Sequence, residues 1–196
     1  MIVCTGTRKR RLEIPGEKES LGRCVRQSAA RDAHLFRDRL VAVVGGGDSA
    51  LEGCLRLSEA GVRQVLLIAR SPLRARGDFR ERVARLDNVK LLPIGRTITE
   101  IIPTGAGCSI TFDDGTSRIV AAVFVRIGVE PTTPRLAAGI EIDPNGFLLV
   151  DERKSTTLPG IFAAGDVTST PLRSIATSVA DGAVAARGVA EFLEFS

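Results

Sequence analysis

The chain has 196 residues, 44% of them hydrophobic and 26% charged, with a formal net charge of +4, which suits one large or two small globular domains with a buried core. No apolar stretch approaches the roughly 20 residues of a membrane span, no secretory leader opens the chain, and the absence of Trp and Tyr disfavours nucleic-acid binding through stacked bases. Four cysteines without a C-x-x-C pair, beside a single histidine, disfavour a zinc site and indicate free thiols in the cytoplasm.

Strands and helices are predicted to alternate in the first half of the chain. The pattern gives, in order, a short strand at 1–6, a short helix at 25–33, a buried strand at 41–44, an amphipathic helix ending at Gly61 and a second strand at 65–68. Because the first strand has no earlier element to pair with, we expect an open sheet edge there that favours association.

The second half changes in texture, because short strands joined by turn residues replace the alternation. The predicted elements are a helix at 78–86, a strand at 89–94, short strands at 97–102, 108–112 and 118–122, a strand at 123–128, a loop at 132–139, strands at 140–142, 147–150 and 160–164, and a long helix at 173–195. The three short strands indicate an antiparallel β meander inserted in the α/β unit.

A glycine-rich turn, VAVVGGGDSALEG, lies between the predicted strand at 41–44 and the helix after it, with the G-x-G-x-x-A spacing of a dinucleotide-binding turn. Gly45 permits the tight turn, Gly47 lets the backbone approach a pyrophosphate, and Ala50 lets the helix pack closely on the strand. The helix start, at Asp48 and Ser49, would direct backbone N–H groups at the same anion. The alternative is an ordinary α/β turn that binds no ligand.

Four segments, in this order, carry a resemblance to a known family: MIVCTG, VAVVGGGDSALEG, FVRIGVEPTT (which contains Gly128) and GIFAAGDV. The chain resembles the pyridine nucleotide-disulfide oxidoreductases, and among them the thioredoxin-reductase type. The resemblance implies a Rossmann-like, three-layer α/β NAD(P)-binding domain at 39–126 with the β meander inserted. It also implies that the flanks, 1–38 and 127–196, are parts of an FAD-binding domain.

The resemblance also implies a flavin-contacting motif near the C-terminus. Asp166, after Gly165, would accept a hydrogen bond from the ribityl chain of the flavin. The long helix, which opens near Arg173, Ser174 and Ile175, would point its N-terminus at the flavin pyrimidine edge, where a positive helix end stabilises negative charge. Arg173 matches the family, whereas Ser174 replaces the usual Gln. The alternative is a plain turn that closes a strand.

Two departures from the family bear on the chemistry. The family's N-terminal glycine turn, which holds the FAD diphosphate, would precede the first residue of this chain. The redox motif C-A-T-C-D corresponds here to residues 28–32, SAARD, so both thiols are absent and dithiol chemistry is excluded at this position. Asp32 is expected to have a structural role and His34 to lie on the surface. No residue is assigned as catalytic, and none as a metal ligand.

The loop after the strand at 65–68 predicts the choice of nicotinamide cofactor. An NAD-selective turn places an acid there, but this strand ends in Ile-Ala-Arg. Arg70 and Arg74, with Arg76 beside them, suit a 2′-phosphate because guanidinium groups bind phosphate with paired donors. The sequence therefore predicts NADPH over NADH, and the alternative is a solvated basic loop.

These observations lead to two expectations about function. The first is an NADPH-dependent flavoprotein oxidoreductase, truncated or split, that passes hydride from NADPH to FAD and has no dithiol of its own. Its FAD site would need a second chain or a dimer mate to be complete. The alternative is a non-catalytic NADP(H)-binding module, a degenerate homologue of the family. Neither expectation involves nucleic acid or a membrane.

Overall fold

The computed structural model describes residues 1–133 and 139–194, and it divides into two compact units. One unit comprises residues 9–128, and the other comprises residues 1–8 with 129–196. The sequence placed the start of the nucleotide-binding domain at residue 39. The compact unit starts earlier, because the segment before residue 39 contributes a strand to its sheet. The predicted loop at 132–139 falls mostly outside the described residues.

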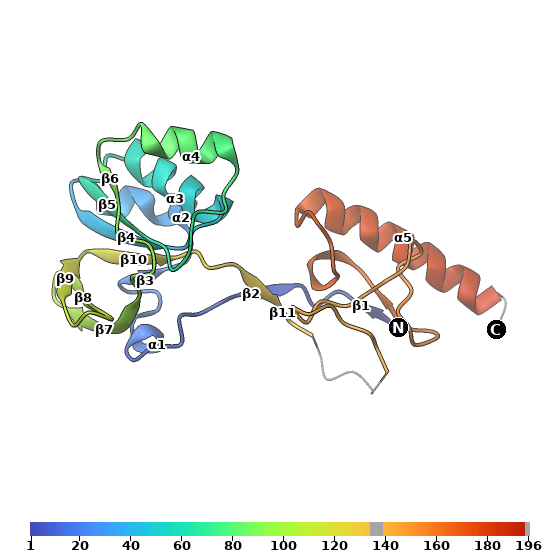
Figure 1. The fold of residues 1–196 in the computed structure, drawn as a ribbon. Coiled ribbons are helices and arrows are strands. Elements are labelled where there is room, and N and C mark those ends of the chain that lie inside the picture. The colour runs from blue at the N-terminus through green and yellow to red at the C-terminus, as the bar shows by residue number, and fades with distance from the viewer. Residues whose placement is uncertain (134–138, 195–196) are drawn as a thin grey trace. The chain divides into compact units, whose positions relative to one another are not determined.

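A five-stranded sheet forms the centre of the first unit (Figure 1). Its strands, in spatial order, are β3 (Val25–Arg26), β10 (Ala122–Val125), β4 (Leu40–Val44), β5 (Gln64–Ile68) and β6 (Val89–Leu91). All neighbouring pairs are parallel. Such a sheet is buried on both faces, which explains why its central strands are continuous apolar runs rich in Val, Leu and Ile.

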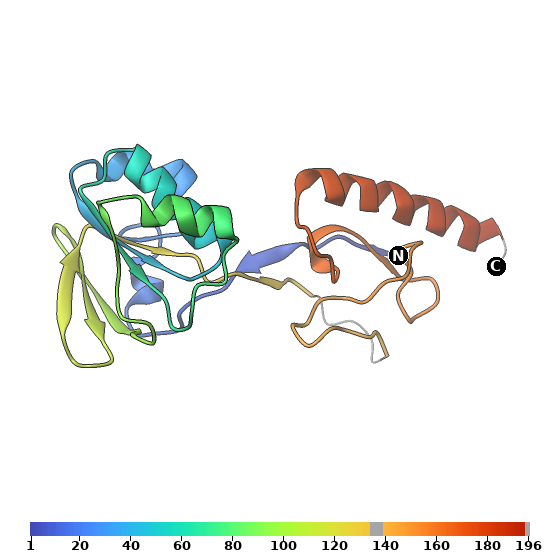
Figure 2. The ribbon, with the colours of Figure 1, turned by 45° about the horizontal axis from the view of Figure 1, so that its top comes forward.

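Helices cover one face of this sheet and a second sheet covers the other. The helices are α2 (Ala29–Asp32), α3 (Asp48–Glu59) and α4 (Gly77–Ala84), and α3 lies beside α4 (Figure 2). Val41 and Val43 of β4 pack towards the helices, whereas Ala42 and Val44 pack towards the second sheet. This alternation follows from the period of two residues along a strand, and it confirms the predicted three-layer α/β fold.

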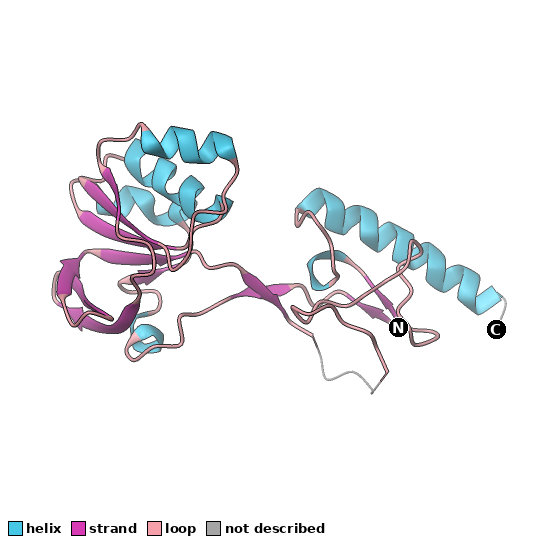
Figure 3. Ribbon diagram, in the orientation of Figure 1, coloured by secondary structure: helices cyan, strands magenta, loops and turns pink. Residues whose placement is uncertain are grey.

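The second sheet is the predicted β meander, formed by β7 (Ile98–Thr104), β8 (Gly107–Phe112) and β9 (Ser117–Val120) (Figure 3). The three strands are antiparallel neighbours. Alternate residues of β8 are buried, so one face of the meander completes the core and the other faces solvent. A short helix, α1 (Glu17–Ser20), contacts β7.

The predicted helix at 25–33 is wrong in its first residues. Val25 pairs with Val123 at the edge of the sheet, and the helical part begins only at Ala29. Ser28 starts that helix, because its Oγ accepts a hydrogen bond from the backbone N–H of Arg31 at 3.3 Å. A 3-10 turn, η1 (Ala33–Phe36), follows.

The second unit contains the two ends of the chain. Strand β1 (Ile2–Val3) pairs in parallel with β12 (Phe162–Ala163), so the prediction that the first strand lacks a partner is wrong. Strands β2 (Thr7–Lys9) and β11 (Val129–Pro131) form another pair. The 3-10 turn η2 (Gly165–Val167) and the long helix α5 (Ile175–Glu194) complete the unit.

Two of the predicted strands in this unit reduce to single bridges. Ile142 and Leu148 are paired across a turn, where the predictions had strands at 140–142 and 147–150. The turn between them is present, and the backbone N–H of Gly146 donates to the carbonyl of Asp143. Among the described residues, no helix is long and apolar enough to cross a membrane.

Candidate nucleotide-binding site

A cavity of about 510 Å³ lies at the carboxyl ends of β10, β4 and β5. This edge of a parallel sheet is where α/β proteins bind nucleotides, because the turns into the helices leave space there. The cavity brings together most residues predicted for the nicotinamide nucleotide: Gly45, Gly47, Asp48, Ser49, Arg70, Arg74 and Gly128. Ala50 does not line it and is fully buried behind the turn.

The two glycines of the turn have different tasks. Gly45 has φ +142°, and a Cβ there would lie 2.2 Å from the carbonyl oxygen of Arg126. The fold itself therefore requires glycine at this position. Gly47 has φ −97° and ψ −179°, an ordinary extended conformation, and a Cβ there would meet no atom within 4 Å. The space beside Gly47 is therefore available to a ligand.

Backbone donors line the start of α3. Within the described residues, no acceptor is found for the backbone N–H groups of Gly47, Asp48 and Ser49. These are the first N–H groups of a 12-residue helix, which cannot be paired inside the helix. Their common direction and the positive end of the helix dipole suit an anion.

Asp48 is held in place by a residue that was grouped with the phosphate-binding arginines. Its carboxylate accepts from the backbone N–H of Arg76 at 2.8 Å and lies 3.0 Å from Arg76 Nε. Arg76 also covers the ring of Phe79 and does not line the cavity. Arg76 therefore ties the basic loop to α3, which corrects its grouping with Arg70 and Arg74.

The cavity is more basic than the sequence indicated. Six arginines line it: Arg10, Arg11, Arg70, Arg74, Arg96 and Arg126. Only Arg70 and Arg74 were assigned to the cofactor, whereas the basic segment 8–11, which contains Arg10 and Arg11, was interpreted as either a phosphate-binding or a solvated segment. The loop that carries them is fixed to the turn, since the backbone N–H groups of Arg74 and Ala75 donate to the carbonyl of Gly46 at 2.8 and 3.1 Å.

Sequence reasoning missed Arg96 and Arg126, and of these Arg96 is held by the meander. Its guanidinium lies 4.1 Å from the centre of the Phe112 ring and pairs with Asp114 at 2.5 Å. Hydrogen bonds from Thr116 and the ion pair with Arg96 hold the pKa of Asp114 at about 2. No local motif marks Arg96, because its position depends on how the meander packs on the parallel sheet.

The residues predicted for the flavin belong to the other unit. Gly165 has φ +74°, and the carboxylate of Asp166 accepts from Ser178 Oγ at 3.3 Å. Arg173 lies over the Phe147 ring at 3.9 Å. Ser174 starts α5, because its Oγ accepts from the backbone N–H of Thr177 at 3.1 Å.

Ile175, the first residue of α5, is 86% exposed. The nucleotide cavity and a smaller cavity at the opposite edge of the sheet are not lined by Gly165, Asp166, Arg173, Ser174 or Ile175. The assignment of these residues to flavin binding therefore stays a prediction.

The residues at positions 28–32, where the resemblance placed the redox thiols, have structural partners. Asp32 is buried, and its carboxylate lies 2.8 Å from Arg31 Nε and 3.8 Å from Arg26 Nη1. The hydrogen bond from Arg31 is the main cause that holds the pKa of Asp32 below its usual value. These contacts agree with the structural role expected for Asp32, and His34 is exposed as expected.

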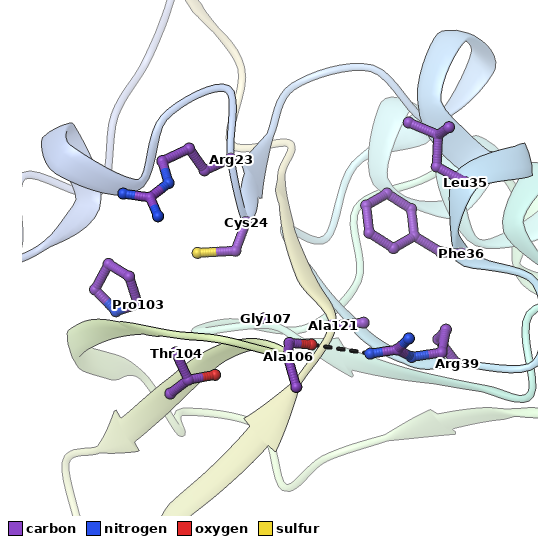
Figure 4. Close-up of a pocket in the computed structure, with 10 residues that line it drawn as sticks. All are labelled: Arg23, Cys24, Leu35, Phe36, Arg39, Pro103, Thr104, Ala106, Gly107 and Ala121. Carbon is purple, nitrogen blue, oxygen red and sulfur yellow. Dashed lines mark hydrogen bonds between the residues drawn. The ribbon is translucent and has the colours of Figure 1, made fainter.

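The smaller cavity, of about 300 Å³, lies at the amino edge of the parallel sheet (Figure 4). Cys24 and Ala121, which precede β3 and β10, form part of its wall. Arg39, which precedes β4, donates to the carbonyl of Ala106 at 2.9 Å across the cavity. Sequence reasoning did not find this cavity. Among the described residues, no cluster of His, Cys, Asp and Glu could hold a metal ion.

Comparison with known proteins places this geometry in a family. Thioredoxin reductase of Listeria innocua is 35% identical over an alignment of 201 positions that covers 99% of this chain and 62% of that protein. Thioredoxin reductase of Treponema pallidum is 35% identical over an alignment of 199 positions that covers 99% of this chain and 64% of that protein. The chain therefore spans less than two thirds of the length of either relative.

The solved structures agree. The crystal structure of Lactococcus lactis thioredoxin reductase is similar with a TM-score of 0.85 and 32% identity, over 100% of this chain and 66% of that one. The model of one family, described as pyridine nucleotide-disulphide oxidoreductase, matches residues 1–182. The chain belongs to the pyridine nucleotide-disulphide oxidoreductase family.

Proposed function

We propose that residues 9–128 bind NADP(H) in the cavity at the carboxyl edge of the sheet. We also propose that the chain is the nicotinamide-binding part of a thioredoxin-reductase-like flavoprotein oxidoreductase. The observation that carries the proposal is the position of Gly47. It faces empty space at the start of α3, inside a cavity lined by six arginines. A dinucleotide pyrophosphate matches these donors in charge and in its need for close backbone approach.

The proposed preference for NADPH over NADH rests on the wall formed after β5. Arg70 and Arg74 line the cavity there, and no acid follows the strand to accept the ribose 2′-hydroxyl. Guanidinium groups would instead bind a 2′-phosphate. The two arginines would contribute about 1.5–3 kcal/mol each before screening by solvent, which corresponds to a preference of about ten- to a hundredfold after that loss.

The proposed second cofactor is FAD, which accepts hydride from the nicotinamide when it is bound. In the other unit the residues fit it in part. The carboxylate of Asp166 has only Ser178 as a hydrogen-bond partner among the described residues, so it can accept another donor. The 20-residue helix α5 begins with its cap at Ser174 and offers a positive end to reduced flavin. A second chain or a dimer mate would supply the remaining contacts.

The alternative function is a non-catalytic NADP(H)-binding module. The observation that favours it is the content of positions 28–32, where Ser28 caps a helix and Asp32 pairs with two arginines instead of two thiols facing each other. In that case the chain would bind the nucleotide without passing electrons on. The proposed compartment is the cytoplasm in either case, because all four cysteines are free thiols.

An absorption spectrum separates these functions. The purified chain is incubated with FAD, passed through gel filtration, and then mixed with NADPH, while NADP⁺ and NAD⁺ binding is measured by calorimetry on the same sample. A retained flavin band that NADPH bleaches supports the oxidoreductase. NADP⁺ binding without flavin retention supports a nucleotide-binding fragment, and a search for the chain that completes the FAD site then separates a split oxidoreductase from a binding module. If neither NADP⁺ nor NAD⁺ binds, the proposed site is wrong.

A further inference from the structure

Arg126, the residue after β10, reaches under the glycine-rich turn. Its Nε donates to the carbonyl of Ser49 at 3.2 Å, and its Nη1 donates to the carbonyl of Gln27 at 2.7 Å. Ser49 is in the first turn of α3, so these two bonds fix the guanidinium beside the helix start. Arg126 also lines the cavity. Its charge is thus held beside the first turn of α3, in the wall of the same cavity.

The surroundings of Arg126 contain an excess of positive charge. Lys9 Nζ donates to the same carbonyl of Gln27 at 2.6 Å, so two cations share one neutral acceptor. Burial lowers the pKa of both side chains, and Arg126 and Arg31 lower that of Lys9 further. The acids that oppose this are Glu52 for Arg126 and Asp32 for Lys9. Asp32 is already bonded to Arg31.

The strand order separates Arg126 from the predicted 2′-phosphate contacts. Strand β4, which leads into the turn, lies between β10 and β5. Arg126 follows β10 on one side, and Arg70 follows β5 on the other. The 2′-phosphate and the pyrophosphate lie at different points of a dinucleotide. An arginine bonded to the first turn of α3 is placed for the pyrophosphate, which binds at that helix start.

We propose that Arg126 is a pyrophosphate-binding residue that strengthens the binding of NADP(H) and NAD(H) equally, whereas Arg70 and Arg74 distinguish the two. This inference deepens the proposed nucleotide function and depends on it. The pyrophosphate occurs in both nucleotides, so Arg126 sets affinity without setting preference. A bound pyrophosphate would offset the electrostatic repulsion between the positive charges of Lys9 and Arg126.

The test compares Arg126→Gln with Arg118→Gln in the full chain. Arg118 is exposed on β9 outside the cavity, so its replacement makes the same change in net charge. Dissociation constants are measured for NADP⁺, NAD⁺ and adenosine 2′-monophosphate, which has the 2′-phosphate but no pyrophosphate. We expect Arg126→Gln to bind both dinucleotides about tenfold more weakly. Its affinity for adenosine 2′-monophosphate and its ratio of NADP⁺ to NAD⁺ affinity should both stay within about twofold of wild type.

A second readout separates a charge effect from a structural one. Raising the salt concentration should shrink the difference between wild type and Arg126→Gln, because screening weakens an electrostatic contact but leaves a packing defect unchanged. If Arg126→Gln does not fold, Arg126→Lys keeps the charge and should bind NADP⁺ within about threefold of wild type, which is well under the loss of a full charge-assisted contact.

The possible outcomes distinguish the proposed role of Arg126 from the proposed nucleotide-binding function on which it depends. If the wild-type chain binds neither dinucleotide, the proposed function fails and the inference fails with it. If wild type binds both and Arg126→Gln matches Arg118→Gln, the function stands and the role of Arg126 is wrong. Equal losses for adenosine 2′-monophosphate and the dinucleotides, or a tenfold loss in a folded Arg126→Lys chain, would show that Arg126 only supports the shape of the site.

Discussion

Replacing Gly47 by Val separates the nucleotide site from the fold that holds it. Gly47 has ordinary extended backbone angles, and a Cβ there meets no atom within 4 Å. A side chain at this position therefore starts in open space from an unstrained backbone conformation. The Gly47→Val substitution is expected to lower stability by less than about 1 kcal/mol. This cost comes chiefly from the position of Gly47 as the N-cap of α3, where valine is less favourable than glycine.

The same side chain would occupy the space through which a pyrophosphate reaches the backbone. The N–H groups of Gly47, Asp48 and Ser49 have no acceptor among the described residues, so they are the donors at risk. A hydrogen bond to a charged group contributes about 1.5–3 kcal/mol, and losing two of them costs about 3–6 kcal/mol. The expected loss of NADPH affinity is therefore at least about a hundredfold.

Two other glycines make the comparison sharp. Gly105, in the turn between β7 and β8, also has empty space around its Cβ position and lies outside the cavity. Gly105→Val should therefore bind NADPH as wild type does. Gly45→Ala should destabilise the chain by more than about 2 kcal/mol, because the added Cβ would overlap the carbonyl oxygen of Arg126 at a positive φ.

The assay is a fluorescence titration with NADPH, with thermal unfolding followed by circular dichroism on the same samples. The reasoning predicts a folded Gly47→Val chain that does not bind and a destabilised Gly45→Ala chain. A folded Gly47→Val chain that binds NADPH within about threefold of wild type, far below the expected loss, would refute the placement of the pyrophosphate.

Three further outcomes follow from the contacts described above. Replacing Arg70 and Arg74 together by Ala should lower the NADP⁺/NAD⁺ affinity ratio by about tenfold or more and leave NAD⁺ binding nearly unchanged, as measured by calorimetry. An unchanged affinity ratio would show that the loop has no role in selectivity. Iodoacetamide at about pH 8 should modify the exposed Cys4 and spare Cys54, because burial raises the pKa of the Cys54 thiol to about 12. Peptide mass mapping with and without denaturant would check this, and early modification of Cys54 in the folded chain would contradict its burial. The pKa of Asp32 is depressed in the folded state, so the stability that its carboxylate contributes is present above the unfolded-state pKa and is lost as pH falls through the folded-state pKa. Urea unfolding should therefore show Asp32→Asn to be less stable than wild type by about 1–2 kcal/mol at about pH 7 and by much less near pH 3. A difference in stability that does not depend on pH would exclude the carboxylate as its source.

The elements that sequence reasoning located well are those whose signals are local. The run at β4, the glycines after it and the amphipathic helix α3 all fall within the segment 40–59. Their periodicity and turn chemistry need no knowledge of distant residues. The meander was predicted for the same reason, since its central strand β8 alternates between buried and half-buried residues and its turns contain Gly, Pro and Asp.

The errors arose where a distant residue determines the structure. Val25 has neighbours in sequence that favour a helix, but it pairs with Val123 at the sheet edge. Ile2 was expected to lack a partner, yet its partner is Phe162, far along the chain and parallel to it. A parallel pairing of this kind leaves no local sign, because the connection between its strands contains the rest of the fold.

The same distinction explains which part of the nucleotide site was found. Arg70 and Arg74 lie in the loop that follows the turn motif and the next strand, so the motif directs attention to them. Arg126 enters the site only because β10 lies beside β4 in register, with Val125 opposite Val44, which places the next residue next to the turn. A local sequence motif cannot predict a charged residue that strand pairing brings into the site. An estimate of a nucleotide site from its motif alone therefore underestimates its positive charge.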